Sequence, residues 1–200
     1  MPYAYRLIEP NGWDPMSHGE VDMLMALARG IPTTNPVIIN IGADLGLSTI
    51  AFLEARRDAV VFSCDIGACE REIENVAAAG LETARVIRLL GRSQDIGAAF
   101  PYQCDLLFID GGHDEASVRG DIEVWVPRVK AGCVFAFHDY IPGEKPANNP
   151  AEVDAAVDAL VIGRYPEVGR VDRIIAFRVP STDDRQTAWY ATASEARVPA

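Results

Sequence analysis

Residues 37–49 read Val-Ile-Ile-Asn-Ile-Gly-Ala-Asp-Leu-Gly-Leu-Ser-Thr, and this run carries more structural information than any other part of the chain. A β-branched apolar run leads into a turn with two glycines and then into an apolar helix start, which is typical of a buried parallel strand feeding a helix across a ligand site. Gly42 lets a ligand approach the backbone, and Gly46 allows close packing where the helix begins. Ser48 or Thr49 is expected to cap that helix. The run predicts a site for a nucleotide-like small molecule.

The remainder of the chain alternates strands and helices. Short apolar runs end at acidic or small residues, and segments with helical periodicity end near glycine or proline. This alternation with short connections predicts a Rossmann-like, doubly wound α/β sheet with helices on both faces. The expected strands are 37–41, 59–64, 84–90, 105–109, 133–137 and a pair within 168–179; the expected helices are 17–29, 48–55, a segment around Ile73 that stops at Gly80, 94–100, 115–129 and one over 153–161.

Length and composition fit one domain. The chain has 200 residues, of which 49% are hydrophobic, enough to bury the core of one α/β unit. We expect a single domain with an amino-terminal helical segment at 1–180 and a tail at 181–200. Trp189 and Tyr190 stand in that otherwise polar tail and suggest an anchor for a partner, such as a second copy in a homodimer.

The charge and the cysteine spacing argue against several classes of partner and of cysteine site. The formal net charge of 18 − 29 = −11 is spread along the chain, which argues against nucleic-acid or anionic-membrane partners. The amino terminus lacks a basic region followed by an apolar run, and no apolar stretch approaches the length of a membrane span. The four cysteines show no CxxC spacing and are expected to be reduced thiols. We therefore expect a cytoplasmic protein with a small-molecule substrate.

A carboxylate after the second strand strengthens the ligand hypothesis. The glycine pattern Gly42-x-x-x-Gly46-x-Ser48 is by itself a weak signal. Asp65, however, ends the next strand 65 − 46 = 19 residues past Gly46, where a carboxylate can accept hydrogen bonds from both hydroxyls of a ribose. The alternative is that Asp65 caps the following helix. The combination fits an adenosine-containing ligand.

A longer pattern resembles a known family. The chain contains Asp105 to His113 (Asp-Leu-Leu-Phe-Ile-Asp-Gly-Gly-His), and it continues with Val118, Asp121, Trp125, Pro127, Ala131-Gly132 and His138-Asp139-Tyr140. This pattern resembles class I S-adenosylmethionine-dependent methyltransferases, in particular a branch with Ile-Asp-Gly-x-His and a later His-Asp, and the likeness runs from about Ile38 to Tyr140. The resemblance implies a seven-stranded, mostly parallel sheet with an antiparallel last strand, and S-adenosylmethionine as cofactor.

The resemblance also implies site residues. Two departures matter: Asn40 stands where the family usually has an acidic residue, and Glu115-Ala116 replaces a Tyr-Glu pair. An asparagine supplies no charge toward the ammonium group of the ligand. Carried over by position, the cofactor-binding residues are Gly42, Ala43, Asp44, Gly46, Ser48, Asp65, Ser93, Gln94 and Asp110, with Gly91 to Gln94 as the loop against adenine.

Four residues at the ends of two strands carry the expected chemistry: Asp110, His113, His138 and Asp139. In related metal-dependent O-methyltransferases, acidic residues here hold a divalent cation that lowers the pKa of a substrate hydroxyl. By position Asp110, His138 and Asp139 are the metal ligands, and a histidine shifts the expectation from Mg²⁺ toward Mn²⁺, Zn²⁺ or Fe²⁺. His113 is the expected general base, with Asp110 beside it.

Several of these residues also have a purely structural interpretation. Asp44 could cap a turn, Ser93 a loop, and His113 could only tie down a loop, while the two aspartates could bind substrate or backbone without a metal. Trp125 is expected in the core and Asp121 on a solvated helix face. Segments Tyr3 to His18 and Ile141 to Asn149 are expected to select the acceptor.

We expect an S-adenosylmethionine-dependent methyltransferase that methylates an oxygen of a small molecule. Three alternatives stay open. An iron hydroxylase would use His113, His138 and one aspartate. A non-catalytic adenosyl-ligand-binding module is suggested by Asn40. A nicotinamide oxidoreductase is disfavoured because the middle glycine of its fingerprint is missing.

Overall fold

The computed structural model describes residues 1–7, 16–143 and 152–181. Seven strands form one sheet in the order β3-β2-β1-β4-β5-β7-β6. The first five strands are mutually parallel, whereas β7 runs antiparallel to both β5 and β6. The predicted fold is therefore confirmed, including the antiparallel last strand. The strands are β1 Val37–Ile41, β2 Val60–Asp65, β3 Val86–Leu90, β4 Cys104–Ile109, β5 Val129–Phe137, β6 Glu167–Val171 and β7 Ile174–Arg178.

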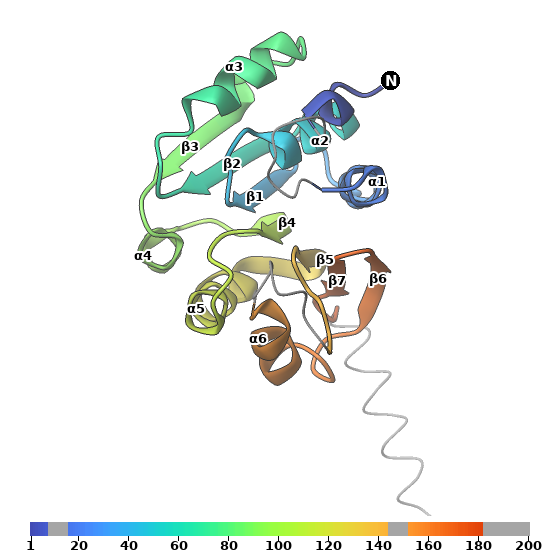
Figure 1. The fold of residues 1–200 in the computed structure, drawn as a ribbon, viewed down its shortest axis with the longest axis vertical. Helices are drawn as coiled ribbons and strands as arrows, with labels where there is room; N and C mark the ends of the chain where they lie inside the picture. Colours follow the sequence, from blue (N-terminus) through green and yellow to red (C-terminus); the bar gives the residue numbers. More distant parts are fainter. Residues whose placement is uncertain (8–15, 144–151, 182–200) are drawn as a thin grey trace, which may run out of the picture.

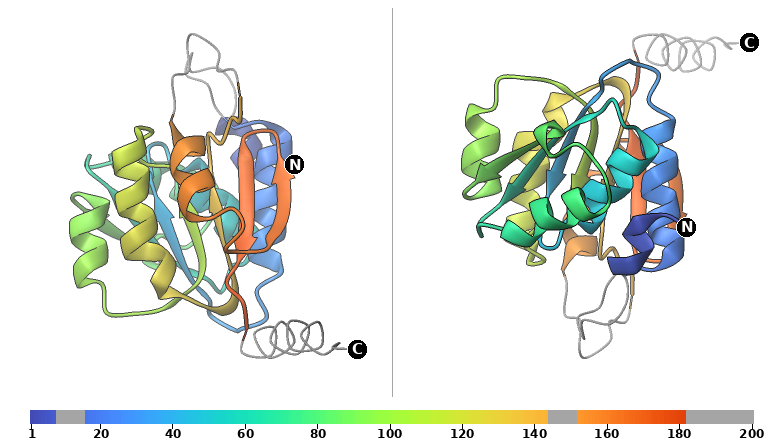
Figure 2. Two further views of the ribbon diagram at one scale, coloured as in Figure 1. Left: turned by 90° about the horizontal axis from the view of Figure 1, so that it is seen from below. Right: turned by 90° about the horizontal axis from the view of Figure 1, so that it is seen from above.

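Helices cover both faces of the sheet (Figure 1). One layer holds α1, α2 and α3 and the other holds α4, α5 and α6, and the two views of Figure 2 face these layers in turn. The helices are α1 His18–Arg29, α2 Leu47–Ala55, α3 Glu70–Ala78, α4 Ser93–Ala99, α5 Glu115–Trp125 and α6 Val153–Leu160, and short 3-10 helices lie at Tyr3–Leu7, Thr83–Arg85 and Val126–Arg128.

The alternation of side chains along β1 explains the two cores. Ile38 contributes to the core under α1 to α3, and Ile39, on the opposite face, contributes to the core under α4 to α6. Because both faces are covered, β1 is apolar almost throughout rather than alternating with polar residues. The one polar residue inside it, Asn40, is fully buried.

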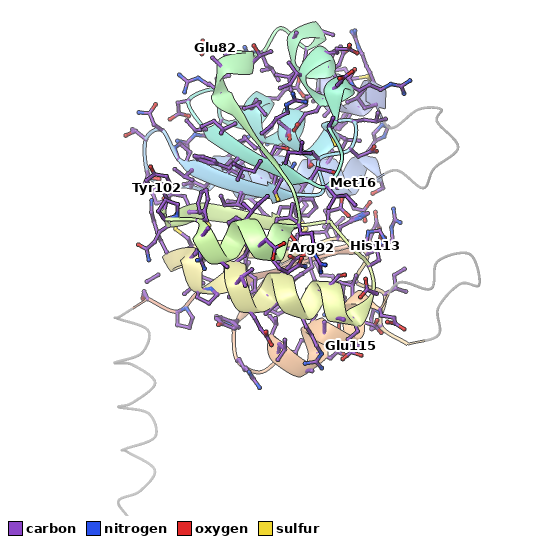
Figure 3. The ribbon with its side chains drawn as sticks, turned by 90° about the vertical axis from the view of Figure 1, so that its left-hand side faces the viewer. Met16, Glu82, Arg92, Tyr102, His113 and Glu115 are labelled. Atoms are coloured by element: carbon purple, nitrogen blue, oxygen red, sulfur yellow. The ribbon has the colours of Figure 1, made fainter. Side chains whose placement is uncertain are left out.

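The strand order reverses between β1 and β4, which fixes the place for a ligand. β1 pairs with β2 on one side and with β4 on the other, so the loops after β1 and β4 diverge at this point. Open α/β sheets bind ligands outside the carboxyl ends of their strands at such a switch point. Tyr102 and His113, which precede and follow β4, lie at opposite ends of the sheet in Figure 3, and His113 marks the carboxyl end.

Three predicted boundaries were wrong by two residues or more. The helix expected over 115–129 ends at Trp125, because Pro127 has no backbone N–H to continue it, and a 3-10 helix follows. β5 consequently begins at Val129 instead of Cys133, and its pairing with β4 is irregular between Cys104 and Leu106. The third strand begins at Val86 rather than at 84, because Thr83–Arg85 forms a 3-10 turn.

Several expectations concern residues outside the described ranges. The tail from 182 onward, with Trp189 and Tyr190, is one of them. Parts of the two expected acceptor-selecting segments, residues 8–15 and 144–149, are others. Among the described residues, no helix is both long and apolar enough to cross a membrane. The four cysteines, all of them in described ranges, are free thiols.

Candidate active site

The glycine turn after β1 is shaped by its contact with the loop after β4. Gly42 has a φ of 86°, and a Cβ there would lie 1.9 Å from the carbonyl oxygen of Asp110. Gly46 has a φ of 82° and begins α2 as its N-cap, where no side chain accepts from the helix N–H groups. The amino end of α2 is thus left without a side-chain cap, as expected of a helix end that faces an anionic group of a ligand. The turn fits an S-adenosylmethionine site.

Ser48 and Thr49 do not cap α2, contrary to expectation. Both are buried and belong to a hydrogen-bonded network. The Ser48 hydroxyl donates to Oδ1 of Asn40 (3.1 Å), and Nδ2 of Asn40 donates to the Thr49 hydroxyl (3.0 Å). Thr49 in turn donates to Oε1 of Glu72 on α3 (2.6 Å), which also accepts from Ser63 (2.7 Å). Asn40 is therefore held from both ends of its amide.

Asp65 holds the glycine turn from the neighbouring strand. Its Oδ2 accepts from the backbone N–H groups of Ala43 (2.9 Å) and Asp44 (3.3 Å), and its Oδ1 accepts from Gly67 (2.8 Å). The alternative of a helix cap is wrong, because α3 begins after Cys69 without any side-chain cap. A cavity of about 160 Å³ opens beside this carboxylate, with Asp65, Ala43 and Gly67 in its lining. Asp44 itself has a φ of 41° in the turn.

The loop expected against adenine is fastened to α5. Ser93 is the first residue of α4, and its hydroxyl donates to Oδ1 of Asp121. Gln94 donates to the carbonyl of Ser117 (3.1 Å), and the Trp125 indole N–H donates to the carbonyl of Ser93 (3.2 Å). The side chains of Ser93 and Gln94 thus position the loop.

Asp121 is buried, and its predicted position on a solvated face is wrong. It is only 1% exposed. Burial raises its pKa to about 6, against the opposing effect of the Ser93 hydroxyl that donates to it. Asp121 therefore connects the interior of the domain to the loop expected against adenine. Trp125, predicted in the core, is fully buried.

The four predicted catalytic and metal residues do come together, in a different grouping. Asp110, His113 and Asp139 place one ligand atom each within 4.8 Å of one another. His113 Nε2 lies 3.4 Å from Oδ2 of Asp139 and 3.8 Å from Oδ1 of Asp110. His138 lies behind this group, with Nδ1 3.1 Å from Oδ1 of Asp110. The residues grouped around one possible ion therefore include His113 in place of His138, and a two-histidine iron site is not formed by them.

Two residues that the sequence analysis missed complete this cluster. Glu20 on α1 is fully buried, and its Oε1 lies 3.4 Å from Nε2 of His138. Arg173, in the turn between β6 and β7, places Nε 3.6 Å from the same Glu20 oxygen and Nη1 3.0 Å from Oδ1 of Asp139. Acidic and basic groups thus alternate around a closed circuit, which we call the charge ring. Its members in order are Asp110, His138, Glu20, Arg173, Asp139 and His113.

Exposure within the charge ring is uneven. The His113 side chain is 46% exposed, whereas those of His138, Asp139 and Glu20 are 5%, 7% and 0% exposed. Asp139 has a φ of 55°, an uncommon conformation for a residue with a side chain and one often found at functional sites. His113 is therefore the member that an acceptor could reach.

The ring controls the protonation of its members. The neighbouring Asp110 carboxylate raises the pKa of His113 above its usual value against the opposing effect of burial, and Asp139 adds to the increase. Burial opposes a charge on His138, but Asp110, Glu20 and Asp139 outweigh it and raise its pKa strongly. Burial likewise opposes ionisation of Glu20 and Asp110, yet the adjacent histidines hold the pKa of both below the usual range.

Comparisons with known proteins agree with this geometry. A sequence profile of a family described as "Methyltransferase domain" matches residues 39–140, just over half of the chain. Among solved structures, the O-methyltransferase TomG from Streptomyces achromogenes, in complex with SAM and involved in tomaymycin synthesis, is 18% identical with a TM-score of 0.67, and the match covers 89% of this chain and 87% of that one.

Two further solved structures show the breadth of the fold. A candidate O-methyltransferase from Klebsiella pneumoniae is 16% identical with a TM-score of 0.68, covering 90% of this chain and 87% of that one. An rRNA methylase from Streptococcus thermophilus is 13% identical with a TM-score of 0.63, covering 84% of this chain and 100% of that one. At these identities the likeness establishes the fold alone.

Proposed function

The chain belongs to the methyltransferase-domain family, and from this premise we propose that it transfers the methyl group of S-adenosylmethionine to a hydroxyl oxygen of a small molecule. The observation that carries the proposal is the contact between the glycine turn and the charge ring. Gly42 packs against the backbone of Asp110, so a cofactor held on the turn reaches the edge where His113 is exposed. The methyl donor and His113, the proton acceptor, would thus lie at the same edge of the sheet.

We assign the cofactor to the carboxyl ends of β1 and β2. The turn from Gly42 to Gly46 and the uncapped start of α2 would receive the methionine part, and Asp65 the ribose. Ile66, which follows Asp65, is 80% exposed and supports an apolar contact with the nucleoside. The side chains of Ser93 and Gln94 are hydrogen-bonded to α5, so the backbone of this loop would be the part that contacts adenine.

The reaction is a nucleophilic displacement at the methyl carbon. The acceptor oxygen forms a bond to this carbon while the bond between carbon and sulfur breaks, and the sulfonium leaves as a neutral thioether. The hydroxyl proton goes to His113. Because Nε2 of this imidazole faces the Asp139 carboxylate, Nδ1 is the nitrogen that accepts the proton. The protein mainly positions the two reactants and takes one proton.

A small-molecule acceptor is favoured by charge. The net charge of −11 would repel a phosphate backbone. The divalent cation expected from the sequence is not part of this proposal; Asp110, His113 and Asp139 are the donors that lie close enough together to hold one.

The test uses purified protein, S-adenosylmethionine with a deuterated methyl group and a panel of phenols, catechols and glycosides. We expect one acceptor class to gain a trideuteromethyl group by mass spectrometry, and His113→Gln to lower turnover by about 10²- to 10⁴-fold while S-adenosylhomocysteine still binds. The non-catalytic alternative predicts binding of S-adenosylhomocysteine with no labelled product for any acceptor. Oxygen-dependent turnover without methyl transfer would instead support the hydroxylase.

A further inference from the structure

The position of Arg173 is fixed by its backbone as well as by its side chain. Its N–H donates to Oε1 of Glu20 (2.9 Å), and its carbonyl accepts from the N–H of Tyr140 (3.0 Å). The preceding residue, Asp172, accepts from the hydroxyl of Ser17 at the start of α1 (2.5 Å). The turn between β6 and β7 is therefore fastened both to α1 and to the end of β5. These contacts hold the permanently charged guanidinium of Arg173 in a defined position.

The Arg173 guanidinium lies against Asp139, one of the two carboxylates that would hold a metal ion. Nη1 of Arg173 lies 3.0 Å from Oδ1 of Asp139, and the arginine side chain is only 18% exposed, which weakens solvent screening. On the other carboxylate of the candidate metal group, Oδ1 of Asp110 already contacts Nδ1 of His138. Each aspartate thus has a basic group against one of its oxygens before any ion enters.

The donor set by itself fits Mg²⁺ poorly, whereas one histidine and two carboxylates would suit Mn²⁺, Zn²⁺ or Fe²⁺, so against these ions the charge arrangement is the argument. Mg²⁺ is bound through oxygen and keeps several waters, whereas the group formed by Asp110, His113 and Asp139 supplies a nitrogen from an exposed histidine. A divalent cation at Oδ2 of Asp139 would lie close to the guanidinium that holds Oδ1 of the same carboxylate. The interatomic distances permit an ion, and the charge arrangement opposes it.

We infer that the guanidinium of Arg173 takes the place of a divalent cation at this site, so that methyl transfer by this chain needs no metal ion. The statement about the reaction rests on the proposed function, whereas the statement about metal affinity stands alone. Arg173 is a positioning residue here: it orients Asp139 so that Oδ2 faces His113, and it supplies the positive charge that a metal would otherwise bring.

The experiment is calorimetric titration of the metal-stripped full chain with Mn²⁺ and with Zn²⁺, with and without S-adenosylhomocysteine. We expect no binding by the wild type up to about 1 mM, the weak end of protein metal sites. Arg173→Gln should gain Mn²⁺ affinity by about tenfold or more, and adding Asp139→Asn to that variant should abolish the gain. Arg173→Lys, which retains a charge, should behave as the wild type.

Stoichiometric Mn²⁺ or Zn²⁺ binding by the wild type that Asp110→Asn or Asp139→Asn removes would overturn the inference, and this arm does not depend on any arginine variant folding. A folded Arg173→Gln variant that still binds no metal would overturn it as well. The S-adenosylhomocysteine heats are read separately, because a wild type that binds no S-adenosylhomocysteine contradicts the proposed function and leaves the metal result standing.

Discussion

Gly42 and Asp110 touch through their backbones, so closely that a side chain on Gly42 would overlap the carbonyl oxygen of Asp110. The cofactor turn after β1 and the acid–base residues after β4 therefore form one rigid unit, joined also by the bond from the Asp110 N–H to the carbonyl of Ile41 (2.8 Å). Any change that separates the two loops should affect cofactor binding and proton transfer together.

Gly42→Ala tests this contact. The substitution meets both a φ of 86° and an overlap at 1.9 Å, so we expect it to lower the free energy of unfolding by more than about 2 kcal/mol and to abolish S-adenosylhomocysteine binding. Gly132→Ala is the matched control, because Gly132 has a φ of 81° with open space around it. It should cost only the conformational strain of about 1–2 kcal/mol and leave binding intact. Equal losses of stability in urea denaturation would show that the contact contributes nothing.

Asp65→Ala separates ribose recognition from loop positioning. The carboxylate accepts from Ala43, Asp44 and Gly67 in the structure, so its loss loosens the turn whatever the ligand is. We expect S-adenosylhomocysteine affinity to fall by about 2 kcal/mol, the range of hydrogen bonds to a charged group. Calorimetry should be repeated with the analogue that lacks both ribose hydroxyls. If Asp65 binds the ribose, the affinities of the variant and the wild type should differ much less for this analogue than for S-adenosylhomocysteine. An equal difference for both ligands would mean that Asp65 only positions the loop.

Asp121 predicts a pH dependence of stability. Its pKa in the folded protein is about 6 against 3.8 for the ordinary carboxyl, so the folded state favours the protonated form. Between about pH 4 and pH 6 the Asp121 carboxyl group is ionised in the unfolded chain but still protonated in the folded protein. The free energy of unfolding therefore falls as the pH rises through this range, by up to about 3 kcal/mol. Asp121→Asn keeps an acceptor for Ser93 and should remove this part of the dependence.

The measurement is urea unfolding of both proteins at pH 4.5 and pH 7.5. Asp95→Asn on α4 is the control, since Asp95 is exposed and its loss changes charge without changing a buried group. A stability difference between Asp121→Asn and the wild type that is the same at both pH values would contradict the assignment.

The sequence predicted the parts of the site that lie at strand ends and missed those that arrive from elsewhere. Gly42, Asp65, Asp110 and Asp139 follow apolar runs, and parallel strands bring their ends to one edge. Glu20, in contrast, has the sequence signature of a capping box with Ser17, and it does fill that role. Its second contact, with Arg173, joins residues 153 positions apart, which no local pattern encodes.

Asp121 shows the opposite error, a residue that spacing could have placed. It lies three residues after Val118 and four before Trp125, on the buried face of α5. Its polar side chain led to the prediction of a solvated position, but the half-buried hydroxyl of Ser93 on α4 gives the buried carboxyl group a hydrogen-bond partner.

Asn40 stands where the resemblance to class I methyltransferases implies an acidic residue, and such a residue could be expected to tighten cofactor binding. The buried network argues that it would not. Asn40 uses its amide N–H₂ to donate to Thr49, and Thr49 uses its single proton to reach Glu72, so an aspartate at position 40 would leave two buried carboxylates competing for one hydroxyl. Burial already raises the pKa of Glu72, and its Oε2 has no hydrogen-bond partner among the described residues.

We therefore expect Asn40→Asp to lower the free energy of unfolding by about 1–3 kcal/mol at pH 7.5 with no gain in S-adenosylhomocysteine affinity. Adding Glu72→Gln should recover most of the stability, because the amide restores one donor and removes one charge. Chemical denaturation and calorimetry of the two single variants and the double variant form a complete cycle. A stable Asn40→Asp protein that binds about tenfold more tightly would mean that the carboxylate reaches the ammonium of the ligand. In that case the network around Glu72 would be a scaffold without influence on the cofactor.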